Sequence, residues 1–157
     1  MKILLISPGT PEEIDNRIIR EIPYLFVKAF FAPHAVTAVA ALTPPEHDVV
    51  IHDEYIHGPV ELTLKNNIYD IIGISITSNQ LKRSLTIAGH CKNISPSSMV
   101  VVGGIGVEIL LNRNKDKENI DVVFHGEAED TWPSFLEDFK KGSWKQVYKN
   151  FSKPDMT

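Results

Sequence analysis

Short apolar segments alternate with helical patterns along the chain. Segments rich in Ile and Val and bounded by Gly, Pro, Asn or Asp predict strands that are buried on both faces, at residues 2–7, 49–52, 70–76, 99–102 and 121–124. Apolar residues at helical spacing predict helices at residues 35–42, 62–67, 79–92, 107–111 and 129–141. This order predicts an α/β protein of the flavodoxin-like, Rossmann-type class. In this class a mostly parallel sheet, here expected to have five strands, lies between two helical layers as a three-layer sandwich.

Individual residues predict where the helices begin and end. Ser78 is expected to cap the start of the helix at residues 79–92. Pro133 suits the first turn of the last helix, which would then begin near Asp130 or Thr131, and Gly142 lies where a C-cap is expected. Residues 9–33 are expected to cover the top of the sheet and to hold a short helix near residues 13–21. Residues 142–157 are expected to add an edge strand before a polar end.

Composition narrows the class of protein and its partners. The chain has 157 residues, of which 43% are apolar and 23% charged, as expected of one folded domain. A net charge of −4 predicts no nucleic-acid partner, and no apolar segment suits a signal peptide or approaches the ~20 residues of a membrane span. Because Cys91 is the only cysteine, the chain cannot form an internal disulfide or an all-cysteine metal site. Cys91 is expected to lie in the core. These features predict a cytoplasmic location without membrane contact.

Glycine-rich loops carry the candidate ligand-binding residues. Ligands of open α/β sheets bind at the carboxyl ends of the strands. There, Gly103, Gly104 and Gly106 would let a ligand approach the backbone, although the segment lacks the dinucleotide fingerprint and the Lys-Ser/Thr of a phosphate loop. The next strand leads into His125-Gly126-Glu127-Ala128-Glu129, which places carboxylates at a helix start. The histidines of the chain have no metal-binding spacing, so no zinc site is expected.

Several motifs follow one another in an order that matches one known family. They are Ala32-Pro33, residues 42–49, Asp53-Glu54, residues 70–75 with Thr77, Val102-Gly103-Gly104-Ile105, and residues 123–129 with Trp132. In this order and spacing they resemble the N-terminal cobalamin (B12)-binding domain of cobalamin-dependent radical SAM proteins. The resemblance covers nearly the whole chain. It predicts a cobalamin-binding-like domain at residues 1–148, followed at residues 149–157 by a polar tail or the start of a linker.

The resemblance implies a cofactor-binding module, in which the corrin lies over the strand ends and the nucleotide tail inserts into the fold. Ser75, Thr77 and Ser78 would donate hydrogen bonds to the tail, while Gly103 and Gly104 would let it pass against the backbone. No catalytic residue and no metal ligand are implied. The implied cofactor-binding residues are Ser7, Pro8, Gly9, Asp53, Glu54, Tyr55, Gly58, Ser75, Ile76, Thr77, Ser78, Gly103, Gly104, Ile105, Gly106, His125, Gly126, Glu127, Ala128 and Glu129.

The resemblance also implies a partner. The iron–sulfur cluster and S-adenosylmethionine of such enzymes would belong to a C-terminal radical SAM barrel, in cis or in trans. A chain with a single cysteine cannot form the Cys-x-x-x-Cys-x-x-Cys motif that holds the cluster. The chain would therefore not be an enzyme by itself but would serve a methyltransferase-type enzyme, whose substrate the sequence does not name.

One position departs from the wider cobalamin-binding pattern. In the motif Asp-x-His-x-x-Gly of that pattern, the histidine coordinates cobalt from below. The same spacing from Asp53 to Gly58 places Tyr55 at the histidine position, so no histidine lower ligand is expected. His57 would replace it only if the loop shifted by two residues. His125 could contact the corrin or only shape its own turn.

Two other interpretations use the same fold. The first is a cofactor-free structural or partner-binding domain, in which bulky residues such as Tyr55 and Ile105 would fill the corrin space. The surface over the strand ends would then be closed and packed. A phosphoacceptor receiver domain needs an acidic pair after the first strand and an Asp after the third, where this chain has Ser7-Pro8-Gly9 and Ser75-Ile76-Thr77. The receiver interpretation is therefore set aside, whereas the cofactor-free interpretation stays open.

Overall fold

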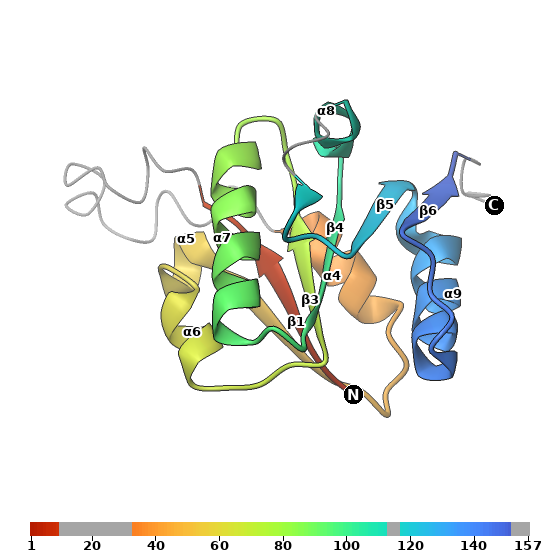
Figure 1. The fold of residues 1–157 in the computed structure, drawn as a ribbon, viewed down its shortest axis with the longest axis horizontal. Helices are drawn as coiled ribbons and strands as arrows, with labels where there is room; N and C mark the ends of the chain where they lie inside the picture. The colour runs from red at the N-terminus through yellow and green to blue at the C-terminus, as the bar shows by residue number, and fades with distance from the viewer. Residues whose placement is uncertain (10–32, 113–116, 152–157) are drawn as a thin grey trace.

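A parallel sheet forms the middle layer of the protein (Figure 1). The computed structural model describes residues 1–9, 33–112 and 117–151. In these residues six strands have the order β2-β1-β3-β4-β5-β6, and all neighbouring pairs are parallel. The strands are β1 (Lys2–Ser7), β2 (Asp48–Asp53), β3 (Ile71–Ser75), β4 (Met99–Gly103), β5 (Val122–Gly126) and β6 (Val147–Asn150). The predicted three-layer α/β fold is confirmed.

The sheet has one strand more than the five expected. The additional strand β6 pairs with β5 at the edge of the sheet, with Tyr148 opposite Phe124. Only Tyr148 among its four residues is buried, so this strand lacks the continuous apolar run that marks a central parallel strand. The edge strand expected within residues 142–157 is thus confirmed, and it extends to Asn150.

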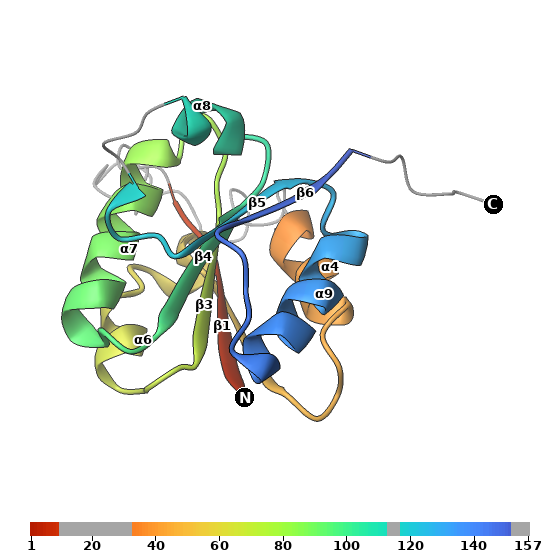
Figure 2. The same cartoon turned by 45° about the vertical axis from the view of Figure 1, so that its right-hand side comes forward.

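Helices cover both faces of the sheet (Figure 2). On one face lie α4 (His34–Ala41) and α9 (Ala128–Lys141), and on the other lie α6 (Glu61–Lys65), α7 (Leu81–Ile94) and α8 (Val107–Leu111). A short helix, α5 (Glu54–His57), follows directly after β2. Because β2 and β3 lie on opposite sides of β1, the chain reverses its direction across the sheet between these strands. In such folds this reversal marks where ligands bind.

Alternate residues of the strands supply two separate hydrophobic cores. One core includes Leu4, Ile72 and Val100 under α6, α7 and α8. The other includes Leu5, Val101 and Phe124 under α4 and α9. The central strands are therefore buried on both faces, which explains their continuous runs of Ile and Val. As predicted, Cys91 lies in the first core and is fully buried.

Two predicted helix starts are wrong. The N-cap of α7 is Gln80 rather than Ser78, because the N–H of Gln80 donates to the carbonyl of Thr77 and extends the preceding turn by two residues. Helix α9 begins at Ala128, so Pro133 lies beyond the first turn and removes one internal hydrogen bond. The predicted C-cap is confirmed, since Gly142 has a left-handed φ of 69°. The helix expected near residues 13–21 lies outside the described residues.

Candidate ligand-binding pocket

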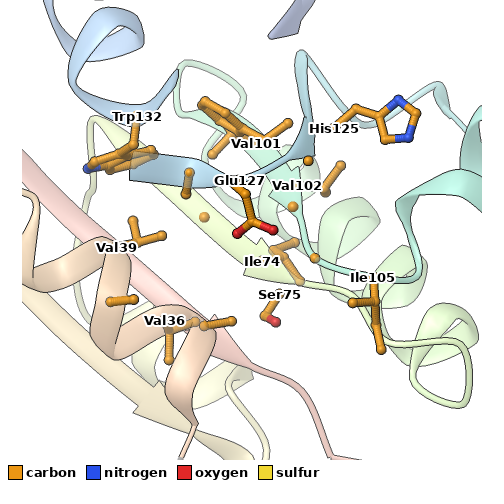
Figure 3. A pocket seen from close by; sticks show the side chains of 18 of the residues that line it. Val36, Val39, Ile74, Ser75, Val101, Val102, Ile105, His125, Glu127 and Trp132 are labelled. Atoms are coloured by element: carbon orange, nitrogen blue, oxygen red, sulfur yellow. The ribbon is translucent and has the colours of Figure 1, made fainter. Parts of the chain in front are cut away.

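A pocket of about 550 Å³ opens at the carboxyl ends of β3, β4 and β5, between α4 and α9 (Figure 3). Its size falls within the range of small-molecule sites. Most of the lining is apolar, and part of it, including Val36, Val101 and Trp132, belongs to the core on the α4 and α9 face. The lining residues are Leu5, Ala35, Val36, Ala38, Val39, Gly73, Ile74, Ser75, Val101, Val102, Gly103, Gly104, Ile105, Glu108, Phe124, His125, Gly126, Glu127, Ala128, Glu129, Trp132 and Phe151.

The floor of the pocket exists because β3 has a glycine in its interior. Gly73 lies in register between Leu5 of β1 and Val101 of β4, on the face that looks toward α4 and α9. A Cβ at this position would lie 2.8 Å from Leu5 Cδ2. On the opposite wall, α4 contributes the small side chains of Ala35 and Ala38. Small residues on two facing elements thus leave space that larger side chains would fill.

Aromatic side chains form the wall of the pocket next to α9. The rings of Phe124 and Trp132 are 5.7 Å apart, and Phe124 also stacks on Tyr148 at 5.5 Å. The indole N–H of Trp132 donates to Thr43 Oγ1 at 2.9 Å, which holds the ring in place. Trp132 is 2% exposed, so this wall is rigid and buried rather than formed by a mobile surface side chain.

The polar groups of the pocket are mostly acidic. Carboxylates of Glu108, Glu127 and Glu129 belong to the lining, which contains no Lys or Arg among the described residues. Figure 3 shows the carboxylate of Glu127 directed into the pocket, on the side of Ser75. The ring of His125 packs edge-on against Phe151 at 4.7 Å, and its Nδ1 is buried without a hydrogen-bond partner in the described part of the chain.

The glycines near the pocket allow backbone segments to cross closely. Gly104 has a φ of +110°, and a Cβ there would lie 2.7 Å from the carbonyl oxygen of Ile76. At Gly126, with a φ of +99°, a Cβ would lie 1.7 Å from the carbonyl oxygen of Asn150. These glycines are therefore required by the packing of neighbouring loops and strands, apart from any contact with a ligand.

The structure brings only part of the predicted site together. Residues of the loops after β3, β4 and β5 line the pocket: Ser75, Gly103, Gly104, Ile105, His125, Gly126, Glu127, Ala128 and Glu129. The other predicted residues do not line it: Ser7, Pro8, Gly9, Asp53, Glu54, Tyr55, Gly58, Ile76, Thr77, Ser78 and Gly106. Of these, Ile76 is fully buried in the core under α7 and α8, and the hydroxyl of Thr77 lies 2.7 Å from Gln80 Oε1.

The contribution of α4 and of the strand interiors to the pocket was not predicted from the sequence. Ala35, Val36, Ala38 and Val39 line the pocket, as does Gly73. Two signals pointed to them. A glycine inside a strand often marks a close approach of a ligand or another backbone, and alanines three residues apart share one face of a helix.

Glu54 is the centre of a buried polar cluster outside the pocket. Its fully buried carboxylate accepts hydrogen bonds at 3.0 Å from the N–H groups of both Gly9 and Val60. The guanidinium of Arg83 donates to the same carboxylate at 3.0 Å and 2.5 Å, and to Glu61 at 3.0 Å. Glu54 thereby joins the chain after β1 and the start of α6 to α7, which gives this predicted cofactor-binding residue a structural role.

The contacts of this cluster shift the pKa values of Arg83 and Glu61. The hydrogen bonds from Arg83 to Glu54 raise the pKa of the guanidinium, so Arg83 stays charged. Burial raises the pKa of Glu61, but hydrogen bonds from the backbone and from Arg83 outweigh burial and lower it below its usual value. One permanent cation, Arg83, is therefore shared by the carboxylates of Glu54 and Glu61.

The loop after β2 is organised by its own side chains. Asp53 Oδ1 accepts the N–H of Tyr55 at 3.0 Å and caps α5. His57 Nδ1 lies 3.1 Å from the backbone N of Asp53, and the imidazole of His52 lies 2.8 Å from the carbonyl oxygen of Gly58. These contacts hold the loop to β2 at the edge of the sheet, and His57 does not line the pocket.

The described residues hold neither a metal-binding cluster nor a membrane-spanning helix. No group of three or more His, Cys, Asp or Glu side chains among them is arranged to hold a metal ion. None of the helices in residues 1–9, 33–112 and 117–151 combines the length and apolar character needed to cross a bilayer.

Comparison with known proteins relates the chain to methyltransferases. It is 27% identical over 114 residues to the bacteriochlorophyllide d C-8(2)-methyltransferase of Chlorobaculum tepidum, a match that covers 73% of this chain and 24% of that protein. It is 29% identical over 147 residues to an uncharacterized methyltransferase of Pyrococcus horikoshii, covering 90% and 30% of the two chains. No protein-family model matches the chain.

A solved structure shares the fold. The radical S-adenosylmethionine methyltransferase TsrM of Kitasatospora setae, solved with its tryptophan substrate and a SAM analog (aza-SAM) bound, superposes with a TM-score of 0.67 at 15% identity. The match covers 90% of this chain and 26% of TsrM. The chain thus has the fold of part of a radical SAM methyltransferase, and it spans less than a third of each of these three proteins.

Proposed function

We propose that this chain is the cobalamin-binding module of a radical SAM methyltransferase. The corrin would lie over the carboxyl ends of the strands, and the nucleotide tail would enter the pocket between α4 and α9. The observation that carries this proposal is the pocket itself, a space of about 550 Å³ at the strand ends with apolar walls. When bound, cobalamin supplies a cobalt centre that can carry a methyl group.

The residues of the pocket suit the tail of this cofactor. The apolar walls at Val36, Val101 and Trp132 match the faces of a flat aromatic base. The hydroxyl of Ser75 at the end of β3 can donate or accept a hydrogen bond. Ile105 is 83% exposed at the rim of the pocket, so it leaves the corrin space open, which favours the cofactor over a closed structural domain.

We further propose that cobalt receives no histidine ligand from this chain. The position expected for such a ligand holds Tyr55, and neither His52 nor His57 lines the pocket. His52 and His57 both make hydrogen bonds within the loop after β2. A histidine at the pocket, His125, packs against Phe151.

The remainder of the activity would reside in a partner. A radical SAM barrel in cis or in trans would hold the iron–sulfur cluster and S-adenosylmethionine. This chain has a single cysteine, Cys91, and burial raises the pKa of its thiol to about 12. A protonated, buried thiol is unsuited to bind iron. The match covers 24% and 30% of the two methyltransferase relatives, so each is more than three times as long as its matched part. This length is consistent with such a division.

Binding of cobalamin can be tested directly with a pocket-filling variant. Ala38 is exposed on α4 and lines the pocket, so Ala38→Phe places a ring in the space without disturbing the core. Ala41→Phe on the same helix is the matched control, because Ala41 is exposed and does not line the pocket. Each protein is incubated with hydroxocobalamin, and the corrinoid retained after gel filtration is measured from its visible spectrum.

The proposal expects one corrinoid per chain in the wild type and in Ala41→Phe, and little in Ala38→Phe. No retention by the wild type, or equal retention by Ala38→Phe, would contradict it and favour the cofactor-free domain. FMN, which fits other flavodoxin-like proteins, serves as a comparison ligand. Its phosphate monoester carries about two negative charges near neutral pH, one more than the phosphodiester of the cobalamin tail. Because the described part of the pocket lining has no Lys or Arg, less FMN than cobalamin is expected to be retained.

A further inference from the structure

Glu127 is held by its backbone in a way that directs its carboxylate into the pocket. Its N–H donates to the carbonyl of Asn150 at 2.9 Å, and its carbonyl accepts the hydroxyl of Thr131 at 2.8 Å. The preceding Gly126 has a φ of +99° and allows the close crossing of β6. Neighbouring elements thus fix the backbone of Glu127 on both sides, and its exposed side chain lies with the carboxylate toward the pocket (Figure 3).

The carboxylate of Glu127 makes no hydrogen bond or ion pair with the described residues. Glu127 is the N-cap residue of α9, yet its side chain makes no capping hydrogen bond. Among the described residues, the pocket lining offers it no Lys or Arg, and the other charged side chains there are the carboxylates of Glu108 and Glu129. A ligand that enters the pocket removes water from this carboxylate, which costs free energy unless the ligand donates a hydrogen bond in exchange.

We propose that Glu127 is a specificity-determining residue, whose carboxylate accepts a hydrogen bond from an amide N–H or a hydroxyl of the ligand. The pocket would thereby favour ligands that place a hydrogen-bond donor at Glu127 over ligands that place an anionic group there. Cobalamin carries such donors in its peripheral amides and its ribose. The inference rests on the proposed cobalamin binding, and it assigns to Glu127 the recognition of these hydrogen-bond donors.

The test compares the dissociation constants for hydroxocobalamin of the wild type, Glu127→Gln and Glu127→Ala. A charge-assisted hydrogen bond predicts affinity about tenfold weaker or more for Glu127→Ala, with a smaller loss for Glu127→Gln, which keeps an acceptor oxygen. Glu118→Gln is the control and is expected to bind as the wild type does, because Glu118 is exposed and outside the pocket. The urea midpoints of both Glu127 variants are expected to stay at the wild-type value.

The outcomes separate this inference from the proposed function. Equal affinity of the wild type and both Glu127 variants would overturn the role of Glu127 and leave cobalamin binding intact. A loss of affinity accompanied by a lower urea midpoint would also overturn it, because the side chain would then act on the fold. Failure of the wild type to bind hydroxocobalamin would overturn the proposed function, and this inference with it.

Discussion

Removal of the Arg83 guanidinium should destabilise the fold strongly. Arg83→Met keeps the aliphatic stem but leaves the Glu54 carboxylate, which is fully buried, with only the N–H groups of Gly9 and Val60 as donors. Breaking one side of a buried ion pair costs about 3–5 kcal/mol, since an uncompensated charge remains. With a urea m-value of about 2 kcal/mol/M, the unfolding midpoint is expected to fall by about 2 M. Circular dichroism at pH 7 measures this midpoint.

Two further variants make the test specific. Arg83→Met combined with Glu54→Gln should recover part of the loss, because the buried group is then neutral. Lys140→Met is the control: Lys140 pairs with Glu46 and Glu137 on the surface, where ion pairs contribute little, so its midpoint should change by a small fraction of the Arg83→Met effect. A fall of less than about 1 kcal/mol for Arg83→Met would refute the argument that Glu54 depends on Arg83.

Two other predictions concern the core and the glycine loops. Because burial raises the pKa of Cys91 to about 12, a thiol reagent at pH 8 should modify this residue only after unfolding; modification of the folded protein at the rate of a free thiol would contradict its burial. Gly104→Ala should cost more than about 2 kcal/mol, since it adds a contact with Ile76 at 2.7 Å to the strain of a positive φ. Gly142 also has a positive φ, but an added Cβ there would have no neighbour within 4 Å, so Gly142→Ala should cost about 1 kcal/mol. Equal losses of unfolding free energy for the two variants in a urea titration would count against the packing argument.

The order of strands and helices was predictable because each central element carries its own pattern. Strand β1 and helix α8 have the bounds that the sequence predicted, and the other central strands differ by one or two residues at one or both ends. The edge strand β6 was expected only in outline, because one buried residue, Tyr148, decides its position. Helix starts were less predictable: the turn at Thr77 and Gln80 displaces the N-cap from Ser78, although Ser78 has the better capping side chain.

The candidate site was predictable only where it follows the strand ends. Loops after β3, β4 and β5 meet at one edge of a parallel sheet, so Ser75, Gly103 and Glu127 could be grouped from topology alone. The loop after β2 was grouped with them by the same rule, yet its strand is at the far edge of the sheet. Its residues Asp53 and Glu54 bond to their own surroundings and do not line the pocket.

The sequence by itself determined the α/β class, the buried strands and the glycine-bearing loops, because these depend on patterns within a few neighbouring residues. Only the tertiary structure decided that Ala38 of α4, Trp132 of α9 and Gly73 of β3 line one pocket. It also decided that Glu54 pairs with Arg83, 29 residues later in the chain. Such contacts depend on how helices and strands distant in sequence pack in three dimensions, and no local pattern of apolar and polar residues records that packing.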